Sequence, residues 1–145
     1  FVTATAPVRY RDATVTVTVT SQDGSFAAQA QERISPVDPL VRIYQIDPLL
    51  GPLFDHAVQG TVAMADTEDS FRAVPYYFGA VPSIAWSVNG AMSGKDQDIT
   101  VRPSGSGAGT AVLGITANQP GTVQTANASF SINFGTKKSL GIFGL

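Results

Sequence analysis

The segment 122–135, TVQTANASFSINFG, alternates strictly between apolar and polar residues. One face carries apolar side chains only: Ala126, Ala128, Phe130, Ile132 and Phe134. The other face carries polar side chains: Thr125, Asn127, Ser129, Ser131 and Asn133. A period of two is the repeat of a β-strand that buries one face and exposes the other. The segment therefore predicts an antiparallel sheet whose apolar face is covered by a second layer, as in a β-sandwich.

Shorter segments separated by Gly and Pro repeat this alternation, and none of them shows ten or more residues of helical period. From Val41 to Phe134 the sequence predicts about seven strands, a number typical of an immunoglobulin-like sandwich. Pro75 lies inside one of them, 70–78, and predicts a bulge or a sheet edge there. We predict that the core is formed by side chains on the apolar, inward-facing side of each alternating strand: Trp86, Ile99, Leu113, Ile115, Phe130 and Ile132.

The N-terminal region carries a separate strand signal. Residues 14–20 read TVTVTVT and place Val15, Val17 and Val19 on one face. An Asp-Gly turn follows, and a second alternating segment runs back to Ile34, which predicts a β-hairpin. A lone hairpin is not stable in water. We therefore expect the valine stripe to be covered, either by this chain's own sheets or by a neighbouring molecule through strand addition.

Proline and composition suggest the domain boundaries. Pro36 and Pro39 predict a stiff linker, so we divide the chain into a hairpin with its linker at 1–36 and a sandwich at 37–135. The alternative is that the hairpin completes a preceding Ig-like domain. Residues 136–145 form a short tail, which either inserts into a neighbour or is disordered. The apolar residues of this tail are Leu140, Ile142 and Phe143.

Composition limits the classes of function. Charged residues make up 14% of the chain, against roughly 25% in typical soluble domains, and the net charge is −2. We expect no nucleic-acid partner because there is no basic stripe, and no membrane span because no apolar run is long enough. The absence of cysteine excludes disulfides, thiolate catalysis and zinc–thiolate sites. Because the sequence starts at Phe1, we expect a processed product or an excised segment.

Catalytic signals are weak. His56 is the single histidine, and we expect a surface position for it, with the neighbouring Asp55 pointing elsewhere. Without partners for His56, a Ser/His/Asp triad is not expected. We therefore predict no enzymatic activity and no cofactor.

Acidic residues cluster in two places and are candidate calcium ligands. They are Asp66, Glu68, Asp69, Asp96 and Asp98. Ca²⁺ takes about six to eight oxygen ligands, which two adjacent loops would have to supply together. The loops lack a DxDxDG pattern, so the alternative is that these carboxylates are simply solvated.

Tyr76 and Tyr77 are candidates for an aromatic ligand platform. In an alternating strand one of the two must face outward unless a bulge intervenes. The alternative interpretation is that both are core aromatics whose hydroxyls find hydrogen-bond partners.

One part of the chain resembles a known group of domains. Trp86-Ser87-Val88-Asn89-Gly90, then Ile99-Thr100-Val101, Gly107–Ala111 and the alternating last strand resemble bacterial Ig-like and PKD-like repeats of surface proteins. The resemblance covers roughly residues 70–135, with Trp86 where such folds often place a core tryptophan. It implies an immunoglobulin-like fold and an extracellular or cell-surface location, but no particular activity.

These observations favour a non-enzymatic structural subunit of an extracellular assembly, such as a surface repeat protein or a pilus-like filament. Its partners would be copies of itself or adjacent Ig-like domains, joined head to tail into open chains. A second hypothesis is an adhesion module that binds carbohydrate or a surface protein. A third is an accessory domain of a secreted enzyme.

Overall fold

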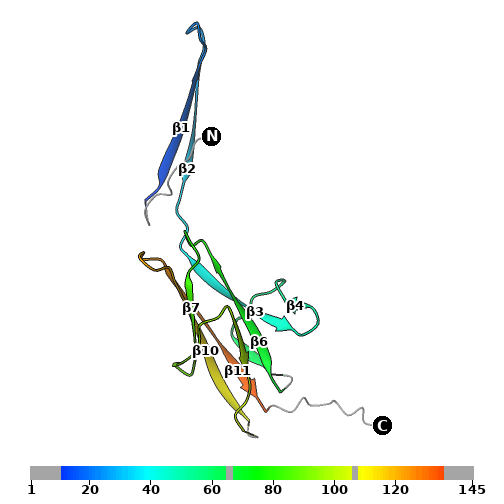
Figure 1. Cartoon of the computed structure of the whole chain (residues 1–145). Coiled ribbons are helices and arrows are strands. Elements are labelled where there is room, and N and C mark those ends of the chain that lie inside the picture. The colour runs from blue at the N-terminus through cyan, green and yellow to red at the C-terminus, as the bar shows by residue number, and fades with distance from the viewer. Residues whose placement is uncertain (1–10, 65–66, 106–107, 136–145) are drawn as a thin grey trace, which may run out of the picture. The chain divides into compact units, whose positions relative to one another are not determined.

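The structure, a computed structural model, describes residues 11–64, 67–105 and 108–135 (Figure 1). Within these ranges all regular secondary structure is β, so the predicted all-β class is confirmed. The chain divides into two compact units, Phe1–Asp38 and Pro39–Leu145.

The first unit contains a two-stranded antiparallel ribbon. Strand β1 spans Ala13–Thr20 and β2 spans Ala27–Ile34. Their register runs without interruption from the pair Ala13 and Ile34 to the pair Thr20 and Ala27. Alternating β-branched residues favour this extended conformation in β1, since Val and Thr fit a pleated surface.

The second unit contains two sheets (Figure 1). The first has the order β4-β3-β6-β9, with strands at Gly51–Pro52, Leu40–Asp47, Asp69–Tyr76 and Asp98–Val101. The second has the order β5-β11-β10-β7-β8, with strands at Thr61–Ala63, Thr125–Phe134, Gly109–Asn118, Ser83–Val88 and Ala91–Gly94. Neighbouring strands are antiparallel, except that β5 runs parallel to β11.

The two sheets share one hydrophobic core, as expected of a β-sandwich. Phe71 on β6 and Phe130 on β11 meet across the sheets with ring centroids 4.8 Å apart. The predicted core is confirmed: Trp86, Leu113, Ile115, Phe130 and Ile132 are buried, and the half-buried Ile99 packs against them. The alternation of 122–135 is also confirmed, because the apolar face of β11 lies on this core.

Of the two alternatives predicted at Pro75, a bulge or a sheet edge, the structure shows the edge. Pro75 lies opposite Val41 in the continuous register of β3 and β6. Strand β9 pairs with β6 only from Asp69 to Arg72. The backbone nitrogens of Ala73 and Pro75 point to the same side of β6, the side of β9. The N–H of Ala73 donates to Gln97 O at 2.9 Å. Pro75 therefore lies beyond the paired part of that edge, where a missing N–H costs no ladder hydrogen bond.

The segment after β3 follows that strand back along its length. Asp47 Oδ1 accepts hydrogen bonds from the N–H groups of Leu49 and Leu50 at 2.8 and 2.9 Å, which forms a tight turn. Further along, Leu53 N donates to Gln45 O and Val58 N to Ile43 O. These bonds hold the segment 48–58 against strand β3 of the four-stranded sheet.

Candidate interaction surface on the N-terminal ribbon

The register of the ribbon defines an apolar face. Residues directly opposite each other in an antiparallel pair point to the same side. The face that we call the valine face carries Ala13, Val15, Val17, Val19, Ala28, Ala30, Glu32 and Ile34. Val17 is 54% exposed and Val19 is 56% exposed. Val17 and Val19 of the valine stripe predicted from sequence are thus exposed on this face of the ribbon.

The opposite face is polar, apart from one alanine. It carries Thr14, Thr16, Thr18 and Thr20 from β1, with Ala27, Gln29, Gln31 and Arg33 from β2. Threonine and glutamine side chains are readily hydrated, so this face suits solvent. The ribbon is therefore amphipathic, with charge on the valine face only at Glu32, opposite Val15.

A dense hydrogen-bonded turn closes one end of the ribbon. Asp23 Oδ1 accepts from Ser21 Oγ at 2.6 Å, from Ser25 Oγ at 2.7 Å and from Ser25 N at 3.1 Å. Gly24 has a φ of 73°, a conformation that glycine adopts without steric cost. The hydroxyls of Ser21 and Ser25, followed by the backbone N–H of Ser25, hold the pKa of Asp23 at about 2.

This turn gives a pH prediction. Because the folded pKa of Asp23 lies below its ordinary value of 3.8, the charged carboxylate stabilises the turn above that value. The contribution should disappear as the pH falls from 3.8 to about 2. We expect a carboxylate-detected NMR titration of the full chain to give a midpoint near 2 for Asp23. Ser21→Ala should move that midpoint upward, whereas Thr18→Ala, on the strand, should not; equal midpoints for all three proteins would contradict the prediction.

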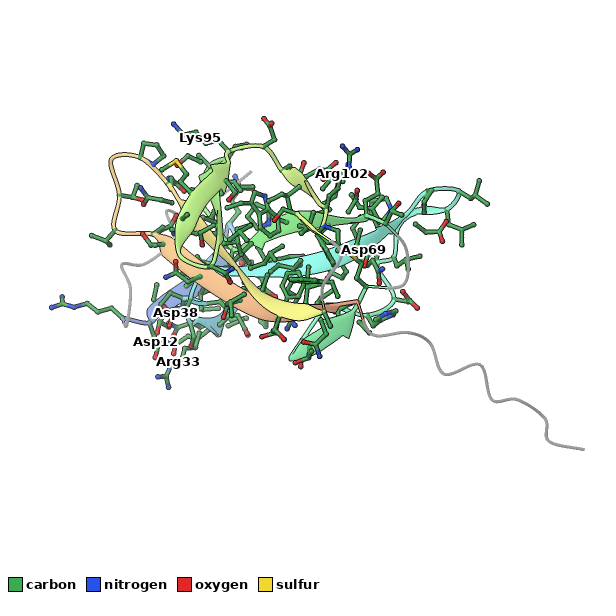
Figure 2. The ribbon with its side chains drawn as sticks, turned by 90° about the horizontal axis from the view of Figure 1, so that it is seen from below. Asp12, Arg33, Asp38, Asp69, Lys95 and Arg102 are labelled. Carbon is green, nitrogen blue, oxygen red and sulfur yellow. The ribbon has the colours of Figure 1, made fainter. Side chains whose placement is uncertain are left out.

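An ion pair holds the open end of the ribbon. Arg33 donates to Asp12 Oδ2 through Nε at 2.7 Å and also through a terminal nitrogen, and Figure 2 shows the two side chains beside each other. Hydrogen bonds from Ser35 and then from Arg33 lower the pKa of Asp12. The Arg33 side chain is 73% exposed and the Asp12 side chain is 32% exposed, so solvent screens the pair, which contributes little free energy and chiefly fixes where the strands begin and end.

The structure pairs two of the predicted calcium ligands with arginines. Arg72 Nε and a terminal nitrogen each donate to an Asp98 oxygen at 2.7 Å across β6 and β9, and this raises the pKa of Arg72. Arg102 donates to Glu68 through Nε. A carboxylate already engaged by a guanidinium is a poorer cation ligand. These two acidic residues therefore serve cross-strand and loop contacts in this structure.

The remaining acidic candidates do not converge either. Asp69 is buried on β6 and accepts from Gln45 Nε2 at 3.4 Å. Asp96 is exposed, and its backbone oxygen accepts from Trp86 Nε1 at 3.0 Å. Asp66 lies outside the described residues. Across the three described ranges, no three His, Cys, Asp or Glu side chains come together as a metal site would require.

The two tyrosines of the predicted platform behave differently. Tyr77 is 59% exposed and has a φ of 63°, an uncommon conformation for a bulky residue. Tyr76 is half-buried, and its hydroxyl lies 3.1 Å from that of Tyr44, which raises the pKa of Tyr76. Phe54 packs edge-on against Tyr44 with ring centroids 5.1 Å apart. Sequence reasoning missed Phe54 and Tyr44 because neither stands near the tyrosine pair in the chain.

His56 is exposed, as expected, but the expectation for Asp55 is wrong. His56 Nδ1 lies 3.0 Å from Asp55 Oδ1, and this hydrogen bond lowers the pKa of Asp55. The two neighbours meet because the chain turns in this loop instead of continuing as an extended strand. Their side chains are 65% and 75% exposed, so the pair lacks the desolvated environment in which a catalytic dyad gains strength.

A small hollow of about 270 Å³ lies between β3, the segment 57–60 and β11. Its walls are mostly backbone and small side chains, including Val58, Gly60 and Ala128. The one charged residue in its lining is Arg42. Without an acid–base pair, this hollow does not resemble a catalytic cleft.

The predicted assembly residues Leu140, Ile142 and Phe143 lie outside the described residues.

Compared with known proteins, the chain matches no family model and no curated protein. In the described ranges, no helix is long and apolar enough to cross a membrane.

Proposed function

We propose that this chain is a non-enzymatic structural module of an extracellular assembly, which joins its neighbours through the N-terminal ribbon. One observation carries the proposal. The ribbon belongs to its own compact unit, and among the described residues β1 and β2 pair only with each other. An amphipathic two-stranded ribbon with open edges and an exposed valine face is poorly stable alone and gains stability from a further strand.

The strand order is compatible with an immunoglobulin-like topology, and this supports the module part of the proposal. In that fold one sheet contains strands A, B and E, and the other contains C, F and G. The order β3-β6-β9 fits the first set, and β7, β10 and β11 fit the second. Trp86 then lies on strand C, the strand that carries a buried tryptophan in immunoglobulin domains. The resemblance to bacterial surface repeats and the low charge content favour an extracellular location.

A deletion tests the role of the ribbon. The members of the sandwich core, among the described residues, all come from residues 41–134, so removing residues 1–35 removes none of them. We expect the shortened chain to keep its β circular dichroism spectrum and its cooperative unfolding. In sedimentation, the full chain should form assemblies and the shortened chain should remain monomeric.

Two results would contradict this proposal. If the deletion unfolds the sandwich, the ribbon belongs to the chain's own core. If the shortened chain folds and assembles to the same mass as the full chain, neighbours join through another surface. The variant Thr16→Ser, which keeps a hydroxyl on the polar face, is the matched control for handling and concentration.

One group of residues favours a second function, an adhesion module that binds carbohydrate or protein. Phe54 and Tyr77 are each 59% exposed and lie near the buried Tyr44 and the half-buried Tyr76. Exposed aromatic rings supply flat apolar faces with polar edges, which suit such ligands. Sedimentation separates the two functions, because a structural subunit joined through the ribbon assembles and an adhesion module without such joining stays monomeric.

A further inference from the structure

We propose that two copies of this chain pair through the outer edge of β1, antiparallel, about a two-fold axis at Val17. This inference deepens the proposed function, on which it rests, by naming the partner and the register. Three features of the ribbon carry it: the direction of the free backbone groups, the palindromic sequence of β1, and the different charge of the two edges.

Within the part of the chain that the structure describes, the backbone groups of β1 that have no strand partner belong to its threonines. In an antiparallel pair, alternate residues direct their N–H and C=O groups to the partner, and the others direct them outward. Ser21 N donates to Phe26 O at 2.9 Å, and this pair continues the register of β1 and β2. By alternation, Val15, Val17 and Val19 bond to β2. The N–H and C=O groups of Thr14, Thr16, Thr18 and Thr20 therefore point to the outer edge.

The sequence of β1 is complementary to itself. Residues 14–20, TVTVTVT, read the same in both directions, with Val17 at the centre. Antiparallel pairing about Val17 sets Thr16 opposite Thr18 of the second copy, and Thr14 opposite its Thr20. These threonines carry the outward backbone groups, so each such pair exchanges two ladder hydrogen bonds. The valines meet on the other face, with Val17 opposite Val17 and Val15 opposite Val19.

Other registers satisfy fewer groups. A shift by one residue sets threonine opposite valine, mixes the two faces and places inward-bonded residues against outward-directed ones. A shift by two residues restores the parity but leaves one end of the palindrome without a partner. The register centred on Val17 therefore pairs the whole of 14–20 and keeps like side chains together. Thr–Thr and β-branched cross-strand pairs of this kind are stabilising in sheets.

The two edges of the ribbon differ in how well they are protected. Charged side chains on an edge strand discourage pairing with another chain. Strand β2 carries two charged residues, Glu32 and Arg33, and its outward-directed residues are those opposite the threonines: Ala27, Gln29, Gln31 and Arg33. Strand β1 has no charged residue and no proline between Ala13 and Thr20. The edge of β1 is therefore the one that accepts a second strand.

Pairing would turn a marginal ribbon into a four-stranded sheet in the order β2-β1-β1-β2. Sheets of three or more strands with an apolar face are independently stable, whereas two-stranded ribbons are not. The valine faces of the two copies would form one continuous strip across the sheet. Because the contact is the same on both chains, it closes at a dimer, and any longer filament needs a second, different contact. This differs from the head-to-tail joining expected from sequence.

Cysteine substitutions test the register, because the chain has no cysteine of its own. Position 17 would face itself in a pair without direct hydrogen bonds, where Cα atoms lie about 4.5 Å apart, within the range for a disulfide. In a glutathione redox buffer, Val17→Cys of the full chain should form a disulfide-linked dimer on its own. Val15→Cys and Val19→Cys should each give no disulfide-linked dimer alone, and they should give one when the two proteins are mixed. Circular dichroism should show that all three variants keep the β fold.

Each other outcome overturns the pairing in a recognisable way. If Val15→Cys alone links as readily as Val17→Cys, the strands stack in parallel, in register. A second outcome is that the native chain assembles through residues 1–35 but no cysteine variant forms a disulfide-linked dimer. The ribbon then uses another surface, so the proposed function stands and the β1 pairing fails. If the native chain sediments as a monomer at all concentrations, both fail together.

Discussion

Phe130→Ala is expected to lower the free energy of unfolding of the sandwich by about 3–5 kcal/mol. Phe130 is 3% exposed on β11 and packs against Phe71 of the other sheet at a centroid distance of 4.8 Å. Removing the ring loses this contact and leaves a cavity between the layers, which a close-packed core closes only in part. Native domains have a free energy of unfolding of roughly 5–15 kcal/mol, so this loss is a large fraction of the total.

Chemical denaturation followed by tryptophan fluorescence measures this effect. Trp86 is the single tryptophan of the chain and is 1% exposed in the sandwich core, so its emission reports on this unit and not on the ribbon. The matched control is Ser129→Ala. Ser129 directly precedes Phe130 on β11, and its side chain lies on the exposed face. If both substitutions shift the denaturation midpoint equally, the assignment of faces on β11 is wrong.

Trp86→Ala should destabilise the sandwich by a similar amount, about 3–5 kcal/mol. Trp86 is among the largest fully buried side chains, and its Nε1 donates to the backbone oxygen of Asp96 at 3.0 Å. The substitution therefore removes core volume and also frees the segment between β8 and β9. Trp86→Phe, which keeps an aromatic ring but not the donor, should cost distinctly less.

Circular dichroism during denaturation measures this second effect, since the fluorescent residue is gone. Met92→Ala is the control, because Met92 is 72% exposed on the neighbouring strand β8, opposite Ser87. It should leave the midpoint almost unchanged. A Trp86→Ala protein as stable as the Met92→Ala protein would show that the core does not depend on this side chain.

The faces of the strands were predictable because they follow from local geometry. Successive side chains of an extended backbone point to opposite sides, so the alternation around Phe130 and around Val17 specifies which residues share a face before any partner strand is known. The same reasoning identified the core members Trp86, Leu113 and Ile132, which are buried. It also identified the valine stripe, which is exposed.

The partners of these faces were not predictable, because pairing depends on residues far apart in the chain. No local pattern shows that Arg72 meets Asp98 or that Arg102 meets Glu68. These ion pairs engage two of the acidic residues that the sequence offered as calcium ligands. The interruption of the valine face by Glu32 likewise follows from the strand register. The adjacent Asp55 and His56 came into contact because their loop turns, which neither residue type predicts.

By itself, the sequence determined the all-β class, the two faces of each long strand, and the palindrome of β1. Only the tertiary structure decided the order of strands in the two sheets, the exposure of Tyr77, and which backbone groups of β1 remain free. The physical reason is the range of the interactions. Side-chain alternation is set within a few bonds of backbone, whereas strand order and register are set by turns and packing between distant segments. The direction of the free groups depends on the Ser21–Phe26 hydrogen bond, and so on how the turn at Asp23 closes.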